Sequence, residues 1–212
     1  MTMNPENPIV AFTIGMFNAV DGPSYCVYTQ AYGMEMQVDD EWPLNVLIMA
    51  PPHLVVSLTS EADVVSMGMI PGASYTPGDG DYSQISENGG QWVLARPSDD
   101  LQKIVRNGLG VLLVIDSADD IDSISNFRGL SSENMIVAFP IDSVSTLTTA
   151  TQMLTEIQTK FAAKQISARI LISGSFAHKD LTDYMTIDGA SGLLLLDASS
   201  DSILELIHNI LG

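Results

Sequence analysis

The chain has 212 residues, of which 46% are apolar and 16% are charged, so it can bury one sizeable core but not two ordinary ones. It carries 26 acidic residues against 8 Lys and Arg, a formal net charge of −18 at pH 7, and no Lys or Arg precedes Arg96. Nucleic acids and anionic membranes bind clustered cations, so this balance argues against both as partners. We therefore expect a single globular domain over residues 1–212.

The same composition indicates a cytoplasmic protein. No apolar run reaches the roughly 18–20 residues that a membrane-spanning helix needs, and the first residues, MTMNPENPIV, lack the basic region of a signal peptide. The chain has one cysteine, Cys26, which excludes an internal disulfide and fits a reducing compartment.

Eight short apolar runs recur along the chain, and each is followed by a turn or a helix. Their residues are apolar throughout rather than alternately apolar and polar, which is typical of strands buried on both faces of a parallel sheet. The runs are 8–15, 44–50, 62–70, 91–95, 111–117, 134–140, 169–175 and 192–199.

The helices between these runs are clearest in the second half of the chain. The stretch 98–110, SDDLQKIVRNGLG, has Ser98 as its expected N-cap and Gly108 or Gly110 as its end. Apolar residues also recur at helical spacing over 146–165 and 199–211. The first half leaves room for helices of only a turn or two. The pattern favours a compact α/β fold, a (β/α)8 barrel with shortened helices and loops, over an open doubly wound sheet.

Acidic side chains follow three of the predicted strands, where the active sites of such barrels lie. Asp116, Asp142 and Asp197 offer oxygen ligands for a divalent cation, but Ser and Asp after a strand also cap helices. We favour the caps and predict neither a metal nor a cofactor. Cys26 and the histidines at 53, 178 and 208 are interpreted as structural residues.

The ordered series of motifs resembles the triosephosphate isomerase (TIM) family. LNVLIMAPPHLVVSL resembles that family's second strand with its Ala-Pro-Pro turn, and RILISGS its seventh strand with a Gly-Gly-Ser turn. MGMIPGASYTPGDGDYSQISENGGQWVLA resembles its third strand, dimer loop and fourth strand, and TIDGASGLLLLDAS its eighth strand with the phosphate loop. The resemblance covers most of the chain and implies a TIM barrel.

The resemblance also implies a reaction, in which a proton moves between the ketone and aldehyde forms of a triose phosphate. In the family a Glu takes the proton, a neutral His polarises the carbonyl, and a Lys stabilises the developing negative charge. The positions that match the Lys, His and Glu are here Gly15, Arg96 and Pro140. Asp142 is the nearest acid to the Glu position, two residues further on and with a shorter side chain.

The family's phosphate site is half retained in this sequence. Gly174 and Ser175 match the Gly-Ser of the strand-seven turn, whose N–H groups and hydroxyl hold the phosphate in the family. After the eighth strand, Leu196 and Asp197 replace the family's Gly-Gly pair, so that a bulky and an anionic side chain oppose phosphate binding. The long lid after the sixth strand is also missing.

A loop over 71–82, PGASYTPGDGDY, matches the segment that reaches into a neighbouring subunit in the family. Its composition is that of an exposed turn, and Tyr75 and Tyr82 are candidate anchors for a contact with another subunit or protein.

The sequence therefore predicts a TIM-like barrel without its catalytic groups, a pseudoenzyme that acts as a structural or protein-interaction subunit. Two alternatives stay open. One is a small-molecule site, for a phosphate ester or a repurposed reaction, at the carboxyl end of the barrel strands. The other is a diverged triosephosphate isomerase in which Asp142 has replaced the Glu.

Overall fold

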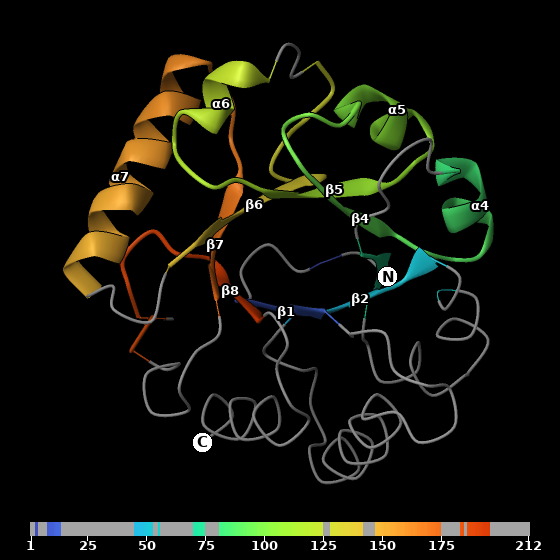
Figure 1. Ribbon diagram of the computed structural model, residues 1–212, viewed down its shortest axis with the longest axis horizontal. Helices are drawn as coiled ribbons and strands as arrows, with labels where there is room; N and C mark the ends of the chain where they lie inside the picture. The colour runs from blue at the N-terminus through green and yellow to red at the C-terminus, as the bar shows by residue number, and fades with distance from the viewer. Residues whose placement is uncertain are drawn as a thin grey trace, which may run out of the picture.

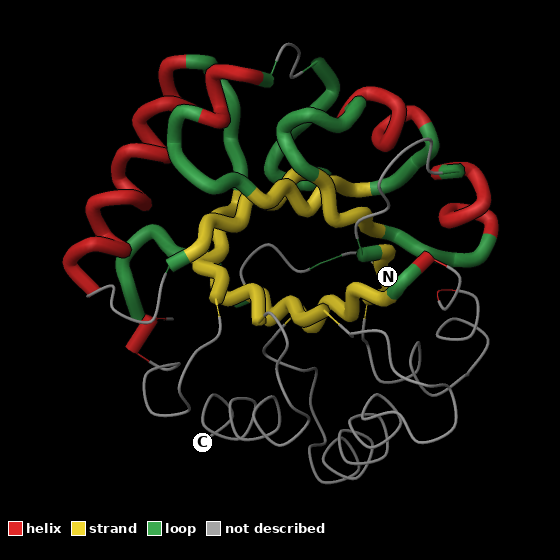
Figure 2. The backbone as a smooth tube through the Cα atoms, in the orientation of Figure 1, coloured by secondary structure: helices red, strands yellow, loops and turns green. Residues whose placement is uncertain are grey.

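The structure is a closed barrel of eight parallel strands (Figure 1). It is a computed structural model that describes residues 3, 8–13, 45–52, 55, 70–74, 81–124, 128–141, 147–174, 183–184 and 186–195. Each strand is hydrogen-bonded to the next one along the chain, and β8 closes the ring on β1. Figure 2 shows the ring of strands with the described helices outside it.

The strands match the apolar runs of the sequence at seven of eight places. They are β1 (Ile9–Thr13), β2 (Asn45–Ala50), β3 (Ile70–Ala73), β4 (Trp92–Ala95), β5 (Gly110–Val114), β6 (Met135–Pro140), β7 (Arg169–Gly174) and β8 (Gly192–Leu195). Closure of β8 on β1 confirms the predicted (β/α)8 barrel and excludes the open doubly wound sheet.

The third strand is the exception, because it shares only Ile70 with the predicted run at 62–70. Pro71 and Gly72 belong to the strand, although both residues usually mark turns. Pro71 has no N–H to donate, but its carbonyl accepts a hydrogen bond from the backbone N–H of Gln91 at 2.8 Å. A Cβ on Gly72 would lie 2.6 Å from the Met49 sulfur and 2.9 Å from the backbone carbonyl oxygen of Trp92, so a side chain there would force both neighbours to shift.

Three of the four named helices are short, as the sequence predicts. They are α4 (Tyr82–Glu87), α5 (Leu101–Arg106) and α6 (Asp120–Ser123), whereas α7 (Leu147–Ala163) has 17 residues. The predicted N-cap of α5, Ser98, is wrong: the cap is Asp100, whose carboxylate accepts the backbone N–H of Lys103 at 3.0 Å. The described chain contains no helix with the length and apolar character needed to cross a membrane.

Two apolar layers form the core, one inside the barrel and one between the barrel and its helices. Alternate residues of each strand enter the two layers, so that Ile9 and Ala11 lie inside while Val10 lies outside. The inner layer consists of Ile9, Ala11, Leu47, Met49, Ile70, Trp92, Leu94, Leu112, Ile136, Ala138, Leu171 and Leu194, all less than a tenth exposed. The barrel is therefore filled by side chains along most of its length.

Glycines make room at two crowded places in this inner layer. A Cβ on Gly110 would lie 2.6 Å from the ring of Trp92, so the indole occupies the space beside β5. Gly192 has φ of +143° at the seam between β8 and β1, and a Cβ there would overlap the carbonyl oxygen of Ile9. Glycine is thus required where the barrel closes.

Candidate functional site

The carboxyl ends of the strands meet at one end of the barrel, which we call the mouth, and active sites of this fold lie there. Arg96 directly follows β4 at the mouth, and Pro140 is the last residue of β6. These are the positions that the resemblance matches to the family's His and Glu. Gly15, which matches the Lys, lies outside the described residues.

Arg96 is held at the mouth by the turn that follows it. Its backbone N–H donates to a carboxylate oxygen of Asp99 at 2.7 Å, and its side chain is exposed to solvent. Its guanidinium is a planar cationic group that only donates hydrogen bonds, so it differs from a neutral imidazole as a carbonyl-polarising group. Pro140 offers no side-chain acid or base at the end of β6.

The phosphate remnant is described only in part. Gly174 ends β7, is buried, and pairs with Leu195 of β8. Ser175, Leu196 and Asp197 lie outside the described residues, as does Asp142. The predicted phosphate contacts therefore stay predictions.

Because inward and outward positions alternate along each strand, the inward positions of the odd-numbered strands fall into three layers of four residues, between which the even-numbered strands add theirs. The two lower layers are Ile9, Ile70, Gly110 and Arg169, and then Ala11, Gly72, Leu112 and Leu171. The third set, nearest the mouth, continues the same alternation with Thr13, Ser74, Val114 and Ser173. We call these four residues the mouth layer.

The mouth layer carries hydroxyl groups, whereas Arg169 is the one polar side chain in the two layers below it. Thr13, Ser74 and Val114 are partly exposed, whereas Ser173 is 0% exposed. The Ser173 hydroxyl has no hydrogen-bond partner among the described protein groups. The sequence analysis does not identify Ser173, because this residue lies inside an apolar run, whereas the Gly174 and Ser175 that follow it match the family's phosphate motif. A lone hydroxyl in a strand buried on both faces is the signal that marks it.

The described acids that follow β5 make hydrogen bonds and ion pairs within the chain. The carboxylate of Asp120 accepts the backbone N–H groups of Asp116 at 2.7 Å and Ser117 at 2.9 Å, which fixes the turn into α6. The helix cap predicted at Asp116 is wrong: the N-cap of α6 is Asp119, whose side chain makes no capping hydrogen bond. Within the described ranges, no three His, Cys, Asp or Glu side chains are grouped so as to hold a metal ion.

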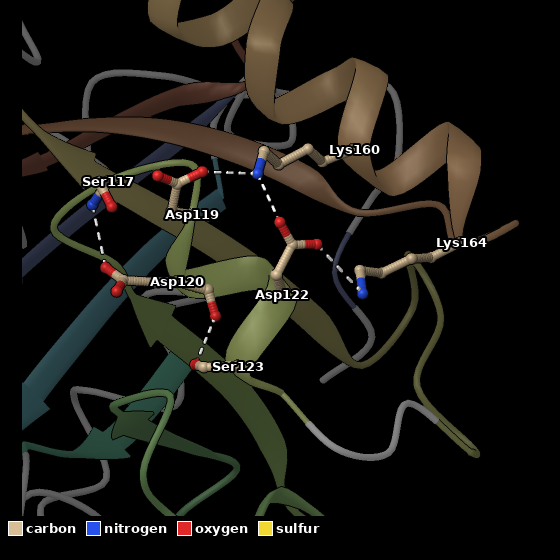
Figure 3. Close-up of polar contacts among 7 residues, drawn as sticks. All are labelled: Ser117, Asp119, Asp120, Asp122, Ser123, Lys160 and Lys164. Carbon is tan, nitrogen blue, oxygen red and sulfur yellow. Dashed lines mark hydrogen bonds and ion pairs between the residues drawn. The ribbon is translucent and has the colours of Figure 1, made fainter.

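The remaining acids of this stretch join α6 to α7 through ion pairs (Figure 3). Lys160 of α7 lies 2.8 Å from Asp119 and 2.6 Å from Asp122, and Lys164 lies 3.4 Å from Asp122. The hydrogen bonds that Lys160 donates to Asp119 and Asp122 raise the pKa of Lys160, and the bond to Asp122 lowers the pKa of that carboxyl. These contacts use two of the chain's eight basic residues to fasten neighbouring helices.

Tyr82, one of the two candidate interface anchors, begins α4 and is 8% exposed. It packs in the layer between barrel and helices, and the Lys103 ammonium lies 5.4 Å from the centre of its ring. Tyr75 lies outside the described residues. The described contacts thus show Tyr82 within the chain's own core, and its contact with a partner stays a prediction.

Comparisons with known proteins find a likeness in structure only. No protein-family model matches the chain, and no curated protein matches it either. A crystal structure of triosephosphate isomerase from Bartonella henselae superimposes with a TM-score of 0.75, over 97% of this chain and 99% of that one, at 16% sequence identity. The predicted resemblance in fold is therefore confirmed: this chain has the barrel of triosephosphate isomerase.

Proposed function

We propose that this chain is a non-catalytic barrel with the fold of triosephosphate isomerase, and that it acts as a structural or protein-interaction subunit. The observation that carries the proposal is the chemistry at the mouth. An arginine follows β4 and a proline ends β6, where the family has its His and its Glu. No lysine precedes Lys103 in the sequence, so β1 and the residues that directly follow it carry none.

The Lys, His and Glu act together in the family's reaction. Replacement of all three therefore argues against isomerase activity more strongly than replacement of one of them would. A base must lie within hydrogen-bond reach of the proton that it removes, and a shift of about 1 Å can cost about 100-fold in rate. Pro140 supplies no base, and Asp142 follows two residues later with a shorter side chain than Glu.

As partners we propose a second copy of the chain or another protein, through the segment around Tyr75. The net charge of −18 favours a partner with a cationic surface and disfavours nucleic acid and anionic membranes. A cytoplasmic location accords with the single cysteine.

A coupled isomerase assay with glyceraldehyde 3-phosphate tests the proposal. We expect the purified chain to give no turnover above buffer. The assay includes Asp142→Asn, which removes the one acid near the missing Glu, and Glu133→Gln as a matched loss of an exposed carboxylate elsewhere. Turnover that Asp142→Asn abolishes and Glu133→Gln retains would overturn the proposal in favour of a diverged isomerase.

A second candidate function is small-molecule binding at the mouth, and the buried hydroxyl of Ser173 favours it. A phosphate ester is the ligand that the match at Gly174 and Ser175 suggests. Titration with glycerol 3-phosphate, followed by the melting temperature Tm, tests this form of the site. A saturable rise in Tm that Ser175→Ala removes is the supporting result, and an unchanged Tm excludes it.

A further inference from the structure

Ser173 is a buried residue of the described interior whose hydroxyl lacks a hydrogen-bond partner. Its side chain is 0% exposed, and its hydroxyl makes no hydrogen bond with a described protein group. Buried hydroxyls are nearly always hydrogen-bonded, because a buried group without a partner loses its bonds to water and gains none in return. Some group other than the described side chains is therefore expected to complete Ser173.

Two further hydroxyls share the mouth layer with Ser173. Thr13 ends β1, and Ser74 directly follows β3, where its backbone N–H extends the ladder to Ala50 with a 2.6 Å hydrogen bond. Val114 is the fourth member of the layer, so three of its four side chains carry a hydroxyl. Each hydroxyl both donates and accepts a hydrogen bond.

The charges of the described residues at the mouth disfavour an ion as the hydrogen-bond partner of Ser173. The layer holds no charged side chain, and of the described Lys and Arg residues Arg96 alone follows a barrel strand at the mouth, with an exposed side chain. The chain's net charge of −18 further opposes an anion. A cation would need carboxylate or carbonyl oxygens rather than hydroxyls alone.

We propose that the mouth layer binds a neutral hydroxyl group, supplied by a small uncharged polyol or by ordered water, which completes the hydrogen bonding of Ser173. Thr13 of β1 lies two strands from β7 in the closed ring and offers an additional partner, since a bound water typically makes about three hydrogen bonds. Ser74 follows β3 on the opposite side of the ring, so it is a partner only for a polyol that extends across the mouth layer. This proposal rests on the second candidate function, small-molecule binding at the mouth, and assigns to Ser173 a neutral ligand in place of a phosphate ester. It does not depend on whether the chain has isomerase activity.

Nuclear magnetic resonance on the full-length ¹⁵N-labelled chain separates the two sources. In the polyol arm, glycerol is titrated, and we expect saturable shifts of the backbone amides of Ser173 and Leu194, which face each other across β7 and β8. Ser173→Ala should weaken this binding about tenfold, the effect of one lost hydrogen bond. In the water arm, the Ser173 amide shows a cross-relaxation signal from long-lived water that Ser173→Ala removes.

Thr159→Val is the matched control, because it removes a hydroxyl on the exposed side of α7, where Thr159 bonds only the backbone carbonyl of Thr155 at 2.8 Å. It should change neither signal. Thr13→Val tests the layer at a partly exposed position, should Ser173→Ala fail to fold. Signals absent from both arms, or unchanged in Ser173→Ala and Thr13→Val, would overturn the proposal.

Discussion

Single residues decide whether the barrel can close. Gly192 combines a positive φ with a backbone that touches Ile9, and both conditions exclude a side chain. Gly129 also has a positive φ, of +80°, but nothing lies within 4 Å of the place where its Cβ would be. Substitution of Gly129 therefore tests the cost of the backbone conformation alone, whereas substitution of Gly192 adds the cost of overlap with Ile9.

We predict that Gly192→Ala lowers the free energy of unfolding by about 3 kcal/mol or more, because the methyl group meets backbone atoms that cannot move aside. Gly129→Ala should cost about 1–2 kcal/mol, the price of the left-handed conformation alone. Urea unfolding followed by circular dichroism measures both. Equal losses would show that overlap at the seam contributes nothing.

Between elements, apolar contacts hold α7 against the barrel. Four of its residues, Ala150, Leu154, Ile157 and Phe161, are buried at helical spacing. We predict that Leu154→Ala lowers the free energy of unfolding by about 2–5 kcal/mol, since it leaves a cavity at a side chain that is 1% exposed. Thr155→Ala, one residue along on the exposed side, is the control and should cost less than about 0.5 kcal/mol by the same urea measurement.

The ion pairs between α6 and α7 add a smaller, salt-dependent contribution. The carboxylates of Asp119 and Asp122 are mostly exposed, which screens their attraction to Lys160. We predict that Lys160→Met lowers Tm slightly at low salt and that the difference from wild type disappears at 1 M NaCl. Arg106→Met, which also removes one positive charge, is the control and should lower Tm at low salt by less than Lys160→Met does.

The same pair of proteins tests the pH dependence of this contact. The folded-state pKa of Asp122 lies below its ordinary value of 3.8, so its contribution is complete above pH 3.8 and is lost as the pH falls through the folded pKa. The Tm difference between wild type and Lys160→Met should therefore be constant from pH 5 to 8 and shrink below pH 3.8. A difference that grows on acidification would contradict the assigned ion pairs.

At the scale of the whole molecule, like charges repel one another across the folded surface. With 26 acids and 8 bases, repulsion outweighs the few ion pairs, and salt screens it. We predict that the wild-type Tm rises between 0.05 and 1 M NaCl at pH 7. Near pH 4, where many carboxylates are protonated, the rise should be smaller. A fall in Tm with salt at pH 7 would show that attractive pairs dominate.

Most of the barrel could be predicted from the sequence, because buried parallel strands are continuous apolar runs such as NMIVAFP. The third strand could not, since Pro71 and Gly72 have the composition of a turn and are accommodated only by contacts with neighbouring strands. The positions of Arg96 and Pro140 at strand ends could be predicted from motif order. The lack of a partner for Ser173 could not, because it depends on which side chains meet inside the closed ring.

Proton exchange at carbon tests the central claim, a barrel of triosephosphate isomerase fold without its chemistry, most directly. Dihydroxyacetone phosphate is incubated with the purified chain in D₂O, and loss of its carbon-bound hydrogen is followed by proton magnetic resonance. Any enzyme of this reaction class must remove that proton, whatever residue serves as base. We predict exchange no faster than in buffer. Exchange above buffer that Asp142→Asn abolishes would contradict the account and identify a displaced catalytic acid.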